Sequence, residues 1–335
     1  GKEVSPGAVG NPARAFCLLF SDELFIDHFR DITQTMSDPT PPICSYEGSD
    51  YQQRFWEEGG RDYEDAVEAL ALKRLLPEEG HFMLELGAGA GRNTPRYRDF
   101  DRVALLDYSR TQLEQARDRL GDSERYLFIA ADIYHLPFVS GLFDGATMIR
   151  TLHHMADPQL AIDQVARVMS PEGIFILEFA NKRNLKAMLR YFLGRQTWSP
   201  YTPEPVEFAA LNFDFHPKAV RAYLRQAGFS IEKQLSVSHF RMNVLKRHIP
   251  TRMLAGLDGL LQWTGGFLQV SPSVFSRCRA PEGNQGAVEG ALFQCPACSA
   301  SLAGWDRRLR CEACGREWDY REGIYDFRLD PPKGA

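Results

Sequence analysis

The sequence lacks any apolar run approaching the roughly 18–20 residues that a helix needs to cross a bilayer. Its one apolar patch near the start is too short for a signal-peptide core, and no convincing cleavage site follows it. Cysteine is sparse: Cys17, Cys44 and Cys278 are scattered, and the other four lie near the end. These absences argue against a membrane-spanning chain and a disulfide scaffold, and we expect a cytoplasmic protein.

The charge of the chain is small overall but unevenly distributed. The 335 residues carry a net charge of −5, with 44% hydrophobic and 25% charged residues, which is ordinary for a globular protein. Residues 1–180 hold 17 Lys and Arg against 30 Asp and Glu, whereas residues 181–260 hold 13 against 5. An acidic half is therefore followed by a basic segment, where an anionic partner would bind most favourably.

The composition changes along the chain in a way that predicts its organisation. Residues 1–48 are rich in Pro, Gly and Asp, and we expect a partly disordered N-terminal extension. Residues 49–245 form the main domain, in which residues 181–217 interrupt the regular pattern as an insertion that would act as a substrate lid. A helix and a linker are expected over residues 246–290, and a small separate module over residues 291–330.

From Phe82 onward, short apolar runs alternate with amphipathic segments. This alternation predicts an α/β fold, with a parallel sheet and right-handed crossovers. Residues 51–76 supply a helix before the first strand. Four residues precede this helix and either close over a ligand or pack at a domain edge: Tyr51, Arg54, Phe55 and Trp56. The first expected strand ends at residues 82–84, and the others span residues 102–107, 126–132, 143–150, 173–179, 229–235 and 237–244. The expected helices span residues 109–120, 158–169 and 217–228.

The first strand runs into three alternate glycines, Gly87, Gly89 and Gly91, and we expect a helix after them. Such a turn brings a ligand against backbone N–H groups, but several nucleotide cofactors use one. Here the last glycine of a dinucleotide turn is replaced by Arg92, which argues against a pyrophosphate. A cofactor with an amino-acid group, a ribose and an adenine needs other partners, and the strand-end acids Asp107 and Asp132 suit its hydroxyl and amine groups.

Five segments resemble the successive motifs of class I S-adenosylmethionine-dependent methyltransferases: FMLELGAGAGR, VALLDYS, FIAADIYHLPF, FDGATMIRTLHHM and RVMSPEGIFILEF. The resemblance covers about residues 51–244 and is to the branch that includes the ubiquinone/menaquinone C-methyltransferases. It implies a Rossmann-like, mostly parallel seven-stranded sheet with helices on both faces, S-adenosylmethionine as cofactor and S-adenosylhomocysteine as product. The cofactor-binding residues that it implies are Glu85, Gly87, Ala88, Gly89, Asp107, Tyr108, Asp132, Ile133 and Arg150.

Two histidines, His153 and His154, stand where that branch often has one. Either could orient the acceptor or take a proton from it, because imidazole titrates near neutral pH. The alternative is a packing or capping role at a helix entry. A non-catalytic protein that binds S-adenosylmethionine on the same scaffold is a second hypothesis for the whole chain.

The acceptor should meet the basic insertion. Lys182, Lys186 and Arg190 are spaced four apart, so on a helix they form one basic stripe, with apolar residues facing away from it. This pattern suits RNA or another anionic molecule, an anionic membrane surface that presents a lipid-like substrate, or merely a solvated face over a core. Protein and small-molecule acceptors also remain open. The candidate substrate residues are Asn181, Lys182, Trp198 and His216.

Near the end of the chain, Cys295 and Cys298 form one CxxC pair, and Cys311 and Cys314 form another. Two such pairs supply four thiolates to one tetrahedral ion, so we expect structural zinc. The segment resembles the small zinc-ribbon activator proteins that partner tRNA, rRNA and protein methyltransferases. Its Gly323-Ile324-Tyr325 differs from their Gly-Ile-Pro by the tyrosine. We expect the ribbon to pack in cis on the catalytic domain.

Overall fold

A computed structural model of the chain describes residues 41–49, 56, 60–288, 290–302 and 308–329. By its contacts the chain divides into residues 1–40 and residues 41–335, and all described residues belong to the second unit. The expected disorder of the N-terminal extension therefore falls mostly outside the described residues, as do Tyr51, Arg54 and Phe55.

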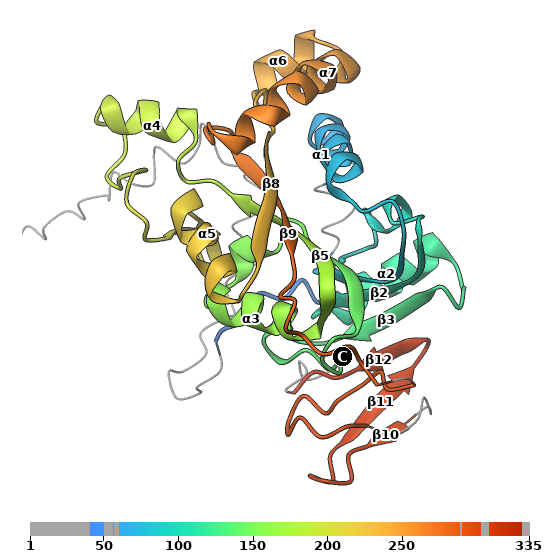
Figure 1. Cartoon of the computed structure of the whole chain (residues 1–335). Helices are drawn as coiled ribbons and strands as arrows, with labels where there is room; N and C mark the ends of the chain where they lie inside the picture. The colour runs from blue at the N-terminus through green and yellow to red at the C-terminus, as the bar shows by residue number, and fades with distance from the viewer. Residues whose placement is uncertain (1–40, 50–55, 57–59, 289, 303–307, 330–335) are drawn as a thin grey trace, which may run out of the picture. The chain divides into compact units, whose positions relative to one another are not determined.

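The main domain is built on seven strands of one sheet, in the order β3-β2-β1-β4-β5-β9-β8 (Figure 1). Six of these strands run in the same direction, and β9 lies antiparallel between β5 and β8. The predicted mostly parallel, Rossmann-like sheet is confirmed. The strands are β1 (Gly80–Leu86), β2 (Phe100–Asp107), β3 (Tyr126–Ala130), β4 (Phe143–Met148), β5 (Met169–Ala180), β8 (Ser230–Val237) and β9 (Ser273–Arg279).

The seventh strand is not where the sequence predicts it. The expected strand over residues 237–244 is replaced by a turn and the short helix α6 (Asn243–His248), because Ser238 adopts a left-handed φ of 68° and redirects the chain. The strand that fills the gap, β9, lies inside the expected linker of residues 246–290 and pairs with neighbours on both sides. The main domain therefore extends beyond residue 245. The helix expected after the glycine turn is likewise only a three-residue 3₁₀ turn, Thr94–Arg96.

Helices cover both faces of the sheet, as predicted, because successive strand residues point to opposite sides. Leu84 and Phe175 pack with α3 and α5 on one face, whereas Met83 and Ile176 lie in the apolar clusters on the other face. The helices on that other face are α1, α2 and α7. The bounds of these helices are α1 (Asp62–Leu75), α2 (Arg110–Leu120), α3 (Pro158–Val168), α5 (Pro217–Gln226) and α7 (Thr251–Leu261).

The C-terminal module, residues 290–329, continues the same sheet. Its strand β12 (Ile324–Asp326) pairs in parallel with β3, and β11 (Glu317–Arg321) and β10 (Arg308–Arg310) follow outward. Its Phe293 and Phe327 belong to the same apolar cluster as the main domain. The module packs in cis as expected, but it shares its core with the main domain instead of forming one of its own. It also covers the edge that β3 would otherwise expose.

The insertion holds the helix α4 (Leu185–Phe192) and a hairpin of β6 (Val206–Ala209) and β7 (Asn212–Asp214). Lys182 is not part of the expected basic stripe, because it lies before the start of α4 and is buried. Nor does α4 lie over a core: of its residues only Ala187 is buried, whereas Leu185 and Phe192 are exposed. None of the helices in the described part of the chain has the length and apolar character of a membrane span.

Candidate functional site

A pocket lies at the carboxyl ends of β1, β2, β3 and β4, where ligands of such sheets bind. Its empty space is about 950 Å³, counting the open mouth. Nine of the predicted site residues line it: Gly87, Ala88, Gly89, Asp107, Tyr108, Asp132, Ile133, Arg150 and His154. Trp56, which the sequence analysis placed either over a ligand or at a domain edge, also lines the pocket. The sequence analysis did not assign the other lining residues, among them Ile43, Cys44, Tyr46, Arg92, Asn93, Gln112, Tyr134, Thr151 and Met155.

The glycine turn forms one wall of the pocket. Gly87 and Gly89 have φ of 66° and 53°, a region that favours glycine. A Cβ at Gly87 would lie 2.2 Å from Thr151 Oγ1, so that position must be glycine. At Gly89 a Cβ would meet only Gln112 Oε1, at 3.8 Å, so the space above this residue is open to a ligand. Gln112 Oε1 is buried and has no hydrogen-bond partner in the described structure, which leaves an acceptor for a ligand donor.

Asp107 ends β2 beside that turn. Its Oδ2 accepts a bond from the Gly89 N–H and its Oδ1 one from the Ser109 N–H, both at 2.9 Å. A carboxylate has about four lone-pair sites, so it can also accept bonds from ligand hydroxyls. Burial raises the pKa of Asp107 to about 6, although these backbone N–H groups oppose the shift. The carboxylate is thus fixed in place and ready to hold a donor.

The raised pKa predicts that ligand binding depends on pH. Hydroxyl donors bind the charged carboxylate, so protonation of Asp107 competes with a ligand that uses it. Affinity for S-adenosylmethionine should be constant well above pH 6 and should fall by about tenfold per pH unit below it. Calorimetric titrations from about pH 8 to about pH 5 would measure this. An affinity that stays level throughout would contradict the assignment of Asp107.

Asp132 and Ile133 stand at the end of β3, on the neighbouring side of the pocket. Asp132 Oδ1 accepts a bond from the Tyr134 N–H at 2.9 Å, and Oδ2 lies 3.1 Å from His135 Nδ1. This cap starts a 3₁₀ turn over Ile133–His135, which places Ile133 and Tyr134 in the lining. An apolar side chain beside a fixed carboxylate suits a flat heterocycle that carries an amine.

Glu85 is the one predicted cofactor residue that does not line the pocket. It lies buried behind the glycine turn, where it accepts a bond from Thr94 Oγ1 at 2.6 Å. Burial raises its pKa to about 7. Its contacts support the turn from behind, so it holds the wall in shape without facing a ligand.

Two arginines and an aromatic ring form another wall. The guanidinium of Arg92 stacks 3.6 Å from the ring centre of Trp56, and Arg150 lies over the same ring. Both arginines pair with the buried Glu68, at 2.6 and 3.1 Å. Burial alone would raise the pKa of Glu68, but Arg92 and Arg150 hold it below its usual value. These cations could meet a ligand carboxylate, and Arg92 was noted in the sequence only as a missing glycine.

The two histidines differ in their environments. His154 lines the pocket; its Nδ1 lies 3.0 Å from the Leu211 carbonyl, which can only accept, so Nδ1 carries the proton. Its Nε2 then accepts from the Tyr46 hydroxyl, at 3.0 Å. Burial lowers the pKa of His154 to about 4, which keeps the ring neutral near pH 7. His153 does not line the pocket and stacks on His154, with its pKa lowered by burial.

Residues 41–49, here called the strap, cross the pocket and bring Ile43, Cys44 and Tyr46 into its lining. Glu47 anchors the strap, because it accepts bonds from the backbone N–H of Arg110 and from the Thr111 side chain. Arg328 of the C-terminal module donates to the same carboxylate at 3.1 Å. The sequence analysis placed these residues in an extension or linker, since their short polar pattern has no periodicity.

The four predicted substrate residues do not gather at the pocket. The Asn181 side chain donates to the carbonyls of Gln269 and Ser271, and Lys182 Nζ donates to the carbonyl of Glu204 at 2.6 Å. His216 caps α5 through the Lys218 N–H. Trp198 lies in the insertion and is not among the lining residues. The first three hold the insertion together, and a substrate contact by any of the four stays a prediction.

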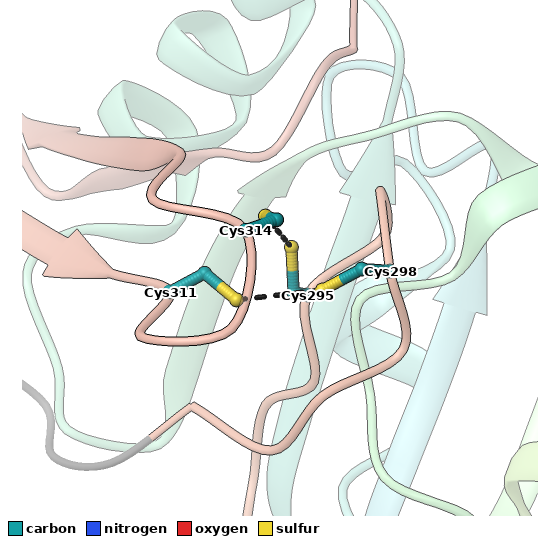
Figure 2. Close-up of side chains that lie close together, drawn as sticks. All are labelled: Cys295, Cys298, Cys311 and Cys314. Atoms are coloured by element: carbon teal, nitrogen blue, oxygen red, sulfur yellow. Dashed lines mark hydrogen bonds between the residues drawn. The ribbon is translucent and has the colours of Figure 1, made fainter.

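The four C-terminal cysteines converge from two turns (Figure 2), and their sulfurs all lie within 4.8 Å of one another. In both turns the residue after the second cysteine, Ser299 or Gly315, has a left-handed φ and donates to the carbonyl of the first cysteine. The sulfurs of Cys295 and Cys314 are 3.7 Å apart, and those of Cys298 and Cys311 are 3.4 Å apart. A tetrahedral zinc with bonds of about 2.3 Å needs separations of about 3.8 Å, so the group fits that ion.

Comparison with known proteins identifies a family for the central part of the chain. Residues 84–177 match the family described as a methyltransferase domain. A demethylmenaquinone methyltransferase of Clavibacter sepedonicus is 28% identical over 47% of this chain and 69% of its own. The O-methyltransferase cnsE of Penicillium expansum is 30% identical over 51% of this chain and 59% of its own. Residues 84–177 therefore carry a methyltransferase domain, as the sequence resemblance implies.

One similar solved structure is a complex of the Trm112 methyltransferase activator of Haloferax volcanii with a methyltransferase. It is 20% identical, with a TM-score of 0.48, over 69% of this chain and 95% of that chain.

Proposed function

We propose that this chain binds S-adenosylmethionine in the pocket and transfers its methyl group to RNA, a protein or a small molecule. When bound, the cofactor supplies a methyl on a sulfonium centre, and in-line displacement by the acceptor leaves S-adenosylhomocysteine. The observation that carries the proposal is the pairing of the glycine turn, which is open above Gly89, with the fixed carboxylate of Asp107. The unpartnered Gln112 Oε1 beside it supports the same ligand.

The lining suggests which residues bind each part of the cofactor. Asp107 accepts from the ribose hydroxyls, and Asp132 with Ile133 holds the adenine. The glycine turn gives the amino-acid portion room against the backbone, and Arg92 and Arg150 face its carboxylate. Glu85 contributes only through the turn that it supports. Each role follows from the hydrogen-bonding capacity of the group at that place in the pocket.

The chemistry needs little from the protein beyond alignment and exclusion of water. Where the acceptor carries a proton, His154 is the better base of the two histidines, because its unprotonated Nε2 faces Tyr46 in the lining. A hydroxyl or amine of the acceptor could replace the Tyr46 hydroxyl at that nitrogen. His153 then acts only as a neighbour that keeps the ring of His154 in place.

We also propose that Cys295, Cys298, Cys311 and Cys314 hold a structural zinc ion. All four ligand positions are thiolates, so no position is left for catalysis. The ion would fix the two turns of a module whose described part is small.

The proposed activity is tested with methyl-labelled S-adenosylmethionine and cell extract that is fractionated into RNA, protein and small molecules. Label that enters one fraction with the full chain identifies the acceptor class. His154→Gln should reduce this transfer while leaving cofactor affinity nearly unchanged. Cofactor binding without transfer to any fraction would favour the non-catalytic alternative, which no observation in the structure supports.

The strap predicts a second effect on cofactor affinity. Glu47→Ala removes the acceptor for Arg110, Thr111 and Arg328, so the strap loses its anchor above the pocket. A charge-assisted anchor is worth roughly 1.5–3 kcal/mol, so we expect the dissociation constant of S-adenosylmethionine to rise by about tenfold or more. Glu114→Gln is the matched control, because Glu114 also pairs with Arg110 but does not contact the strap. Equal affinities of both variants and wild type would contradict a closing role.

A further inference from the structure

Two neighbouring parts of the chain expose an unusual amount of apolar surface. On α4, Leu185, Leu189 and Phe192 are 65%, 56% and 85% exposed. Around α7, Leu257, Leu260 and Phe267 are 47%, 75% and 83% exposed. These six residues, called the apolar face, belong to segments that touch, because the Leu185 N–H donates to the Val270 carbonyl at 2.8 Å. Large exposed apolar patches mark contact sites in proteins.

The helix α7 carries apolar residues on its outer side as well as on its inner side. Its buried side carries the polar Asp258, which accepts a bond from the Tyr63 hydroxyl at 2.7 Å. Gln262, just beyond the helix, is also buried and donates to the Val67 carbonyl. Leu254 and Ala255 pack inward beside Asp258, whereas Leu257 and Leu260 are exposed on the outer side. A helix on a water-exposed surface places its apolar residues inward, so the outer side of α7 is suited to an apolar partner.

The charges around the apolar face have one sign. The segments that carry it, residues 183–195 and 241–268, contain eight Lys or Arg and a single acid. That acid is Asp258, which is fully buried and does not reach the surface. Two of the cations, Arg241 and Lys246, pair with the buried Glu64 of α1, which leaves six. Basic residues beside exposed leucines and phenylalanines are typical of helices that lie in the interface of an anionic bilayer. A second copy of this face would meet it with like charge, which disfavours self-association.

The position of the face is also informative. The helix α4 follows the carboxyl end of β5, and α6 and α7 follow the carboxyl end of the parallel strand β8 (Figure 1). That is the edge of the sheet at which the cofactor pocket lies. All of these helices are short, so the contact would be with the surface of a bilayer.

We propose that the apolar face docks on an anionic lipid bilayer, with its leucines and phenylalanines in the interface and its arginines at the headgroups. The docking does not depend on methyl transfer, so it can be tested separately from the proposed function. The full chain should float with vesicles of phosphatidylcholine and phosphatidylglycerol, and much less with vesicles of phosphatidylcholine alone. Raised salt should weaken the binding, because the charge contribution is screened.

Two sets of variants separate the apolar and the charged contributions. Leu260→Glu with Phe267→Glu removes two exposed apolar contacts, and Arg247→Glu with Arg252→Glu reverses two surface charges. Each pair should lower the partition coefficient to anionic vesicles by at least about tenfold. The altered side chains are exposed, so the variants should keep the wild-type melting temperature, which is measured alongside.

Matched controls carry the same changes elsewhere on the surface. Val288→Glu alters another exposed apolar residue, and Arg98→Glu alters an exposed arginine at the amino end of β2. Neither should change vesicle binding. The proposal is overturned if wild type does not float, if neutral vesicles bind it equally, or if the controls weaken binding as much as the face variants. It is also overturned if the chain does not bind vesicles and the face variants instead abolish self-association or RNA binding.

Discussion

Replacement of Asp107 by asparagine should lower the affinity for S-adenosylmethionine by about a hundredfold. The carboxylate takes two backbone N–H bonds and is proposed to take the ribose hydroxyls as well. An amide keeps the shape but turns one acceptor into a donor, which would face a backbone N–H or the ligand. The loss of charge-assisted bonds and a buried mismatch together cost about 3 kcal/mol. Calorimetric titration with S-adenosylmethionine measures the effect.

Asp101→Asn provides the control for that measurement. Asp101 lies at the other end of the same strand, where it is exposed and pairs with His81 on the surface. Its replacement should leave the affinity at the wild-type value. Should Asp107→Asn bind the cofactor as tightly as wild type, the ligand does not use this carboxylate, and the assignment of the pocket is wrong.

Much of the fold could be predicted because its signals are local. One such run, residues 102–107, is apolar and ends in an acid, and the N-cap Ser109 follows it and accepts a bond from the Gln112 N–H. Each such run therefore became a parallel strand. The strand β9 was missed because Ser273–Arg279 alternates serine and arginine with apolar residues, and its place is decided by pairing with β5 and β8, far apart in sequence. A short stretch of sequence gives no sign of pairing between distant segments.

The residues of the candidate site also fall into those that the sequence predicted and those that it did not. Residues that sit at strand ends, such as Gly87, Asp107 and Asp132, were predicted, because strand direction alone brings them to one edge. Tyr46 and Gln112 reach the pocket through packing, so no spacing rule could identify them. The insertion was misread for a related reason: the charge of Lys182 suggested a surface, but its ammonium is used inside the fold. The role of a charged residue can be assigned only when its hydrogen-bond and ion-pair partners are known.

Removal of metal should destabilise more than the C-terminal module. Phe293 and Phe327 belong to the core of the main domain, and β12 pairs with β3, so loss of the module would expose that core and the edge of the sheet. Structural zinc contributes on the order of 10 kcal/mol to the folding of small domains. If a few kcal/mol of this reach the main domain, Cys311→Ser or strong chelation should lower the melting temperature by about 10 °C.

The metal site itself is tested by zinc content and by cobalt substitution. Wild type should bind one ion per chain, and its cobalt form should show the absorption of four thiolate ligands, whereas Cys311→Ser should lose both. Cys44→Ser is the control, because Cys44 lines the cofactor pocket and should not affect metal content. Because β12 and the strap anchor Arg328 lie in the same module, metal loss should also weaken cofactor binding. A metal-free chain with unchanged melting and unchanged cofactor affinity would show that the cysteines do not support this part of the fold.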